Sequence, residues 1–133
     1  MTAHQRVLII DDDLDFRVSM RSLLESSGYE VIEADSGAEG LRKVVESKPD
    51  MIFLDIMMEN DTEGYIVSYS LRNRDEYADC RHIPIFMISS IEESPDERFA
   101  MADEAGLIHP DYYLTKPLDI PRLLELLKTA VPG

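Results

Sequence analysis

Short apolar runs alternate along the chain with longer segments in which apolar residues recur at helical spacing. Buried strands are predicted at 7–10 (VLII), 51–54 (MIFL) and 83–88 (IPIFMI), where apolar residues follow one another without a polar break. The segments 30–34 (EVIEA) and 111–115 (DYYLT) predict two shorter strands. Five strands are therefore expected.

The segments between these strands predict helices at 13–27, 36–48, 63–74, 94–106 and 119–131. Asp13 and Asp119 stand where an N-cap is expected, Ser36 and Glu39 form a capping-box pattern, and Gly28 follows the first helix as a stop. Three sets of residues are predicted to face the core: Leu41, Val44 and Val45; Tyr65, Ile66, Tyr69 and Leu71; Leu123, Leu124, Leu126, Leu127 and Val131. The polar segment 75–82 is predicted to be a loop.

Strict alternation of strand and helix predicts an α/β domain, with a parallel sheet covered by helices on both faces. Residues 1–133 are predicted to form this single domain, since the chain has the length of one ordinary domain. The carboxyl ends of parallel strands share one edge of the sheet. Polar residues follow four of the strands and are expected to converge there: Asp11 and Asp12, Asp55, Ser89 and Lys116.

Three carboxylates in one crevice repel one another and lose hydration, so a cation is expected among them. The candidate ligands are oxygen atoms, which favours Mg²⁺. With charge neutralised by the metal and Lys116, one carboxylate can act as a nucleophile toward phosphorus. Ser89 is placed to hydrogen-bond a phosphoryl oxygen. On position alone, Asp55 remains open to a second interpretation, a helix cap or a solvated loop acid.

The balance of acidic and basic residues restricts the kinds of partner that the protein can bind. The 133 residues include 13 basic and 27 acidic side chains, a net charge of -14, which argues against direct nucleic-acid binding and against binding to an anionic membrane. The single cysteine, Cys80, fits a reducing compartment, and no apolar run is long enough to span a membrane. We therefore expect a soluble, cytoplasmic protein.

Four motifs in this order resemble the receiver domain of two-component response regulators. They are the DD after the first strand, the FLD of the third, the Ser after the fourth and the KP after the fifth, and the resemblance extends from Arg6 to about Ala130. It implies a flavodoxin-like, CheY-like (βα)5 fold, doubly wound, with strand order 2-1-3-4-5. It also implies Mg²⁺ as the cofactor.

The resemblance assigns a role to each matching position. Asp55 resembles the phosphoacceptor, and Lys116 the lysine that pairs with it and then with the phosphate. Asp12 resembles the direct metal ligand and Asp11 an acid that acts through bound water, and the resemblance also makes Asp55 a metal ligand. The remaining assignments are the Met57 backbone carbonyl as a metal ligand, Ser89 as the switch hydroxyl and Tyr113 as the switch aromatic residue.

The function implied is transfer of a phosphoryl group from a histidine kinase or a phosphotransfer protein to Asp55, which switches a surface that binds a downstream effector protein. Such a domain catalyses only its own phosphorylation and dephosphorylation. A homodimer is a further expectation. The segment 56–65 (IMMENDTEGY) departs from the family pattern, with Glu59 where a proline is usual.

Two alternatives stay open at the level of sequence. The altered segment after Asp55 also fits a pseudo-receiver that docks partners without being phosphorylated. The run IIDDDLD can be read as an apolar strand ending in D-x-D, the pattern of a haloacid dehalogenase-type phosphatase with Asp11 as its nucleophile. Against the phosphatase, only Asp119 and a helix follow Lys116, where that family has a further acidic motif.

Overall fold

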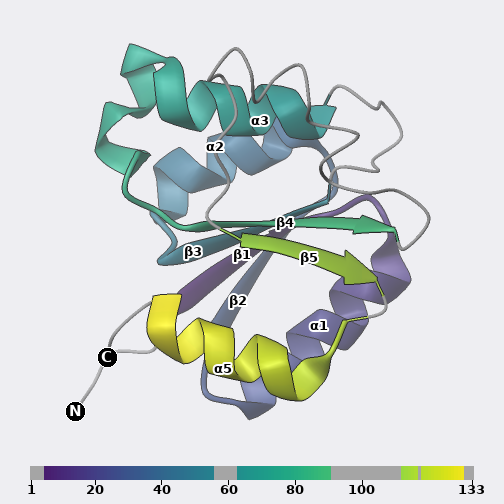
Figure 1. Ribbon diagram of the computed structural model, residues 1–133. Helices are drawn as coiled ribbons and strands as arrows, with labels where there is room; N and C mark the ends of the chain where they lie inside the picture. Colours follow the sequence, from purple (N-terminus) through teal and green to yellow (C-terminus); the bar gives the residue numbers. More distant parts are fainter. Residues whose placement is uncertain (1–4, 56–62, 91–111, 117, 131–133) are drawn as a thin grey trace.

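The computed structural model describes residues 5–55, 63–90, 112–116 and 118–130. Its centre is a five-stranded sheet, all of whose strand pairs are parallel, in the order β2-β1-β3-β4-β5 (Figure 1). The strands are β1 (Arg6–Ile10), β2 (Glu30–Ala34), β3 (Met51–Asp55), β4 (Ile85–Ser90) and β5 (Tyr112–Lys116). The predicted fold class and strand order are confirmed.

Helices cover both faces of the sheet, with α2 and α3 on one side and α1 and α5 on the other (Figure 1). The helices are α1 (Leu14–Ser26), α2 (Gly37–Ser47), α3 (Glu63–Asn73), the 3-10 helix η1 (Asp75–Cys80) and α5 (Ile120–Ala130). The helix predicted at 94–106 lies outside the described residues. None of the described helices is long and apolar enough to cross a membrane.

The ends of the helices follow from local side-chain chemistry. Asp13 Oδ1 accepts hydrogen bonds from the amides of Asp15 (3.0 Å) and Phe16 (3.4 Å), so it caps α1. Gly28, just past the end of α1, has φ +96°, a conformation in which glycine is unstrained. Ser36 Oγ and Asp119 Oδ1 accept at 3.2 and 3.3 Å in the first turns of α2 and α5. These predicted caps are confirmed.

The central strands are buried on both faces. In β1, Val7 and Ile9 pack in the layer with α1 and α5, whereas Leu8 and Ile10 pack in the layer with α2 and α3. The residues of β3 alternate in the same way, from Met51 to Leu54. Asp55 is thus the one polar residue of a strand whose other four side chains are fully buried.

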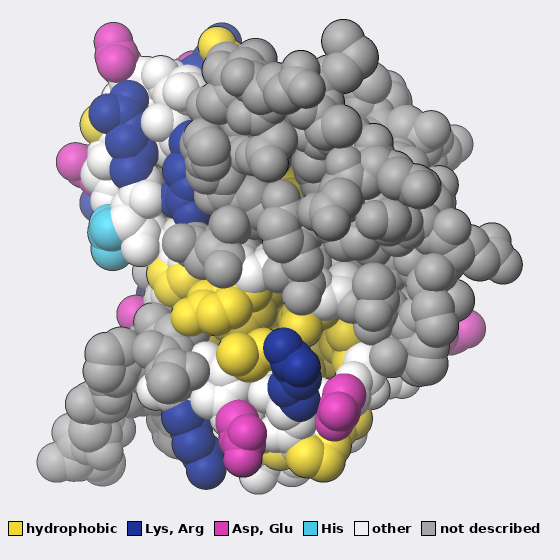
Figure 2. Space-filling model, in the orientation of Figure 1, with side chains coloured by type: hydrophobic (Ala, Val, Ile, Leu, Met, Phe, Trp, Pro, Cys, Tyr) yellow, Lys and Arg dark blue, Asp and Glu magenta, His cyan; other side chains and the backbone are white. Residues whose placement is uncertain are grey.

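The edge beside α5 is built around aromatic rings. Phe86 of β4 makes an edge contact with Phe53, with ring centroids 5.1 Å apart, and stacks on Tyr112 of β5 at 4.5 Å. Figure 2 shows apolar side chains gathered over β5, above the charged outer face of α5. Leu123 and Leu127 anchor α5 in this layer, as its apolar stripe predicted.

Three predictions about single elements are wrong. Ile66 and Tyr69 are 51% and 41% exposed, because α3 buries Val67 and Ser70 in their place; Leu71 is fully buried, as predicted. Val45 of α2 is exposed as well. The segment predicted as a loop at 75–82 contains η1.

The last two strands are shifted along the chain relative to their predicted ranges. β4 runs over Ile85–Ser90, so Pro84 precedes the strand and Ser89 lies inside it. β5 extends as far as Lys116. Pro84 lacks an amide hydrogen that could donate to a neighbouring strand, which explains why β4 begins at Ile85 and not at Ile83 as predicted.

Candidate functional site

Three carboxylates come together at the carboxyl edge of the sheet. Asp11 directly follows β1 and Asp55 ends β3, and one carboxylate oxygen from each of Asp11, Asp12 and Asp55 lies within 4.8 Å of the others. Asp11 and Asp55 are 1% and 3% exposed, whereas Asp12 is exposed. The cluster is therefore buried on one side and open to solvent at Asp12.

Hydrogen bonds fix the backbone at Asp11. Its amide donates to the carbonyl of Ala34 at 3.1 Å, which prolongs the pairing of β1 with β2 by one residue. Its carboxylate accepts from the amide of Asp13 at 2.8 Å, and its carbonyl accepts from Arg17 NH1 at 2.7 Å. The turn after β1 is thus held at its first residue, through the amide, the carbonyl and the carboxylate of Asp11.

The donor set of this cluster suits a hard divalent cation. Mg²⁺ prefers oxygen ligands and retains several waters, so it takes only one or two carboxylates from a protein. An exposed Asp12 beside two buried acids offers such an ion both a ligand and access from solvent. The residues present therefore fit the metal that the sequence predicted.

The strand register brings the other predicted positions to the same edge. In β4, Ile88 pairs with Asp55, so Ser89 lies one residue beyond the level of the acid. Ser89 pairs with Thr115 of β5, and Lys116 is the next residue along. Tyr113 lies earlier in β5, opposite Met87. Met57 lies outside the described residues.

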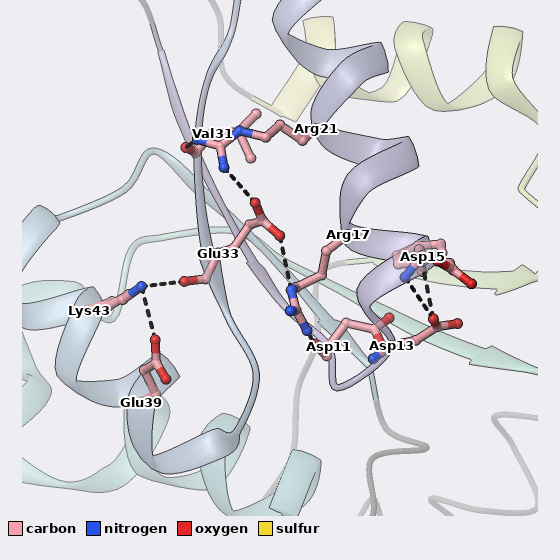
Figure 3. Close-up of polar contacts among 10 residues, drawn as sticks. Asp11, Asp13, Asp15, Arg17, Arg21, Val31, Glu33, Glu39 and Lys43 are labelled. Atoms are coloured by element: carbon pink, nitrogen blue, oxygen red, sulfur yellow. Dashed lines mark hydrogen bonds and ion pairs between the residues drawn. The ribbon is translucent and has the colours of Figure 1, made fainter.

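An ion-pair network lies beside the acid cluster (Figure 3). Arg17 Nε contacts Glu33 Oε1 of β2 at 2.9 Å, and Arg21 NH1 contacts Glu33 Oε2 at 2.6 Å. Lys43 of α2 donates to the carbonyl of Glu33 and pairs with Glu39 at 3.0 Å. The hydrogen bond with Lys43 lowers the pKa of the Glu39 carboxyl.

Arg17 and Glu33 are not among the residues predicted for the site from the sequence. The sequence positions of both residues could have suggested an ion pair. Arg17 lies one helical turn after the capping Asp13, and Glu33 is an acid within a short alternating strand. Neither signal distinguishes such a pair from an ordinary surface ion pair. Only the fold shows that Arg17 also reaches the backbone of Asp11.

A doubly wound parallel sheet with clustered acids at its carboxyl edge is the arrangement expected of a receiver domain, and comparison with known proteins agrees. The family model for the response regulator receiver domain matches residues 7–128. The chain therefore belongs to the response regulator receiver family.

Named relatives share this domain over nearly the whole chain. Protein PilG of Pseudomonas aeruginosa is 33% identical over 128 residues, which cover 96% of this chain and 88% of PilG. The polar-differentiation response regulator DivK of Brucella anthropi is 31% identical, with 92% of each chain covered. The transcriptional regulatory protein PrrA of Mycobacterium bovis is 39% identical, but the match covers only 48% of it.

The solved structure of the chemotaxis protein CheY4 of Vibrio cholerae superposes with a TM-score of 0.78 at 28% identity, covering 96% of this chain and 99% of CheY4. Family, relatives and fold thus agree on a receiver domain of two-component signalling. They do not favour the phosphatase or the pseudo-receiver.

Proposed function

We propose that Asp55 accepts a phosphoryl group from a phosphohistidine of a histidine kinase or phosphotransfer protein. The observation that carries the proposal is the position of Asp55 at the end of β3, almost fully buried, with the carboxylates of Asp11 and Asp12 within 4.8 Å. A carboxylate oxygen of Asp55 forms the new P–O bond as the P–N bond of the phosphohistidine breaks. The imidazole leaves with the electron pair of that bond.

Each neighbouring residue has a proposed part in this transfer. Asp12, exposed at the rim, is the direct ligand for Mg²⁺, and buried Asp11 acts through a bound water. Asp55 and the Met57 backbone carbonyl would be the other two protein ligands. When bound, Mg²⁺ neutralises charge on the phosphoryl oxygens and on the acids.

The switch residues come from the last two strands. Lys116, at the end of β5, pairs with Asp55 and then with the phosphate. The hydroxyl of Ser89 hydrogen-bonds a phosphoryl oxygen, and Tyr113 moves with it. Support for these roles comes from the register that brings β4 and β5 to the edge where Asp55 lies.

The wider proposals follow from membership in the family. Residues 1–133 act as a single receiver domain in the cytoplasm, without direct contact to nucleic acid or membrane. The phosphorylated form binds a downstream effector protein, and a homodimer is one form it adopts. The net charge of -14 supports a protein partner with a basic surface.

The test is phosphorylation by acetyl phosphate with Mg²⁺, followed by intact-mass spectrometry. Wild type is expected to gain one phosphoryl group, and Asp55→Asn none. Asp50→Asn is the matched control: Asp50 precedes the opposite end of β3, where its carboxylate accepts from the amide of Arg6 at 2.7 Å. This variant is expected to be labelled like wild type.

Other outcomes would point to the alternatives. Label retained in Asp55→Asn would contradict the assignment of the phosphoacceptor. Absence of label in a folded wild type would indicate a pseudo-receiver. Rapid hydrolysis of many phosphomonoesters, abolished by Asp11→Asn, would indicate the phosphatase.

A further inference from the structure

Arg17 of α1 joins two segments that are distant in the sequence. Its NH1 donates to the carbonyl of Asp11 at 2.7 Å, and its Nε donates to Glu33 Oε1 at 2.9 Å. Figure 3 shows the guanidinium between the turn after β1 and the side chain from β2. The side chains of Arg17 and Glu33 are only 14% and 20% exposed.

The geometry of this contact is well defined. A guanidinium is planar and presents its donors in a fixed fork, so two acceptors at once set the orientation of its plane. Hydrogen bonds with a charged donor are shorter and stronger than neutral ones. Glu33 itself is fixed by a second contact, from Arg21 at 2.6 Å. Arg17 is therefore held in place before any ligand arrives.

Both backbone polar groups of Asp11 are held by contacts that depend on the end of β2. Its amide donates to Ala34, the residue after Glu33, and its carbonyl accepts from Arg17, which Glu33 orients. The end of β2 thus fixes the peptide groups on both sides of Asp11. The carboxylates of Asp11 and Asp12 project from this fixed backbone into the cluster with Asp55.

We infer that Arg17, oriented by Glu33, is a positioning residue that fixes the backbone at Asp11 so that Asp11 and Asp12 present their carboxylates to a divalent cation. The inference rests on the proposed function, because it assigns Arg17 a part in building the same site. Residues that orient metal ligands typically change metal affinity by about 10- to 100-fold when they are removed.

The charge of Arg17 and its positioning role predict opposite effects on cation binding when Arg17 is removed. Arg17 carries a positive charge next to Asp11, one of the three clustered acids, so its removal would strengthen cation binding if only the Coulomb interaction counted. If Arg17 positions the backbone, its removal weakens binding. The sign of the change therefore distinguishes the two effects.

The experiment measures Mg²⁺ dissociation constants by isothermal titration calorimetry for wild type, Arg17→Ala and Arg6→Ala. Arg6 is the matched control, because it also joins a glutamate of β2 to a backbone carbonyl: it donates to Glu30 at 3.1 Å and to the carbonyl of Ser47 at 2.8 Å. Arg17→Ala is expected to bind Mg²⁺ roughly 10-fold more weakly than wild type. Arg6→Ala is expected to stay within about twofold, because Arg6 begins β1, at the end opposite the acid cluster, and its pair with Glu30 is exposed.

Amide hydrogen exchange without metal provides an independent readout. The Asp11 amide, bonded to Ala34, is expected to lose protection in Arg17→Ala, while the amides in the middle of β1 keep theirs. Glu33→Gln keeps an oxygen that can accept from Arg17, so its Mg²⁺ affinity is expected between those of wild type and Arg17→Ala. This variant also tests the inference if Arg17→Ala does not fold.

Failure of the positioning role can be distinguished from failure of the metal site. If wild type binds Mg²⁺ and Arg17→Ala binds it equally well or more tightly, the positioning role is wrong and the proposed function stands. If folded wild type binds no Mg²⁺, the metal site itself is wrong, and with it the role of Arg17 toward a metal.

Discussion

Ser70 is a buried polar residue on the inner face of α3. Its side chain is 1% exposed, and its hydroxyl has no hydrogen-bond partner among the described residues. Val67 and Leu71, its neighbours on that face, are fully buried. A buried hydroxyl without a partner destabilises the folded state by about 1–3 kcal/mol.

Ser70→Ala is therefore expected to raise the free energy of unfolding by about 1 kcal/mol, because it removes the desolvated hydroxyl and alanine favours the helix. Urea denaturation measures the change. Ser26→Ala is the control: Ser26 is exposed and donates to the carbonyl of Leu23 at 2.7 Å, so its loss should change stability little. A clear loss of stability in Ser70→Ala would show that the hydroxyl has a partner in the folded protein.

At the scale of elements, α2 approaches the end of β1 closely at Gly40. A Cβ added to Gly40 would lie 2.5 Å from Ile10 Cδ1 and 2.8 Å from Ile10 Cγ1. Ile10 is fully buried and directly precedes Asp11. The missing side chain of Gly40 therefore lets the helix pack against the strand that carries the acid cluster.

Gly40→Ala is expected to lower the free energy of unfolding by about 1–2 kcal/mol, because overpacking outweighs the gain in helix propensity. Ile10→Val removes the Cδ1 methyl that the new Cβ would meet first. The same Gly40→Ala change should then cost less in an Ile10→Val background, and a double-mutant cycle by urea denaturation measures this coupling. Strictly additive effects would contradict the close packing of these two residues.

The sequence predicted strands best where apolar residues follow one another without a polar break. β1 and β3 were recognised because all of their core residues are apolar, and the caps at Asp13, Ser36 and Asp119 depend on local chemistry alone. In α3 apolar residues occur all round the helix, so the pattern did not define a single buried stripe. Ser70 lies in that stripe although it is polar, which no hydrophobic pattern could indicate.

For the site, the sequence predicted that the carboxylates of Asp11, Asp12 and Asp55 meet, but not what holds them. Asp11, Asp12 and Asp55 follow strands whose carboxyl ends share an edge, so their proximity depends only on topology. The contact of Arg17 with the Asp11 carbonyl depends on the packing of α1 against β2. That packing joins residues 16 positions apart, Arg17 and Glu33, and no local pattern encodes it.

At the scale of the whole molecule, the acid cluster belongs to a protein with a net charge of -14. Added salt screens the general repulsion between exposed charges, whereas Mg²⁺ bound at the cluster adds stability by mass action. The two contributions can be separated by comparing Mg²⁺ with NaCl at equal ionic strength.

Mg²⁺ at ten times its dissociation constant is expected to raise the free energy of unfolding by about 1.4 kcal/mol beyond the effect of NaCl. Asp12→Asn should lose this additional stabilisation, since it removes the proposed direct ligand. Without metal, the same variant should be at least as stable as wild type, because one of three adjacent like charges is gone. Equal stabilisation by the two salts in wild type would contradict a specific cation site.

The central claim is that Asp55 is the phosphoacceptor, and the most direct measurement is to locate the phosphoryl group in the chain. Borohydride reduces an aspartyl phosphate to homoserine, which tandem mass spectrometry of peptides identifies by position. After treatment with acetyl phosphate and Mg²⁺, homoserine is expected at position 55. Homoserine at position 11, with aspartate intact at position 55, would contradict the claim.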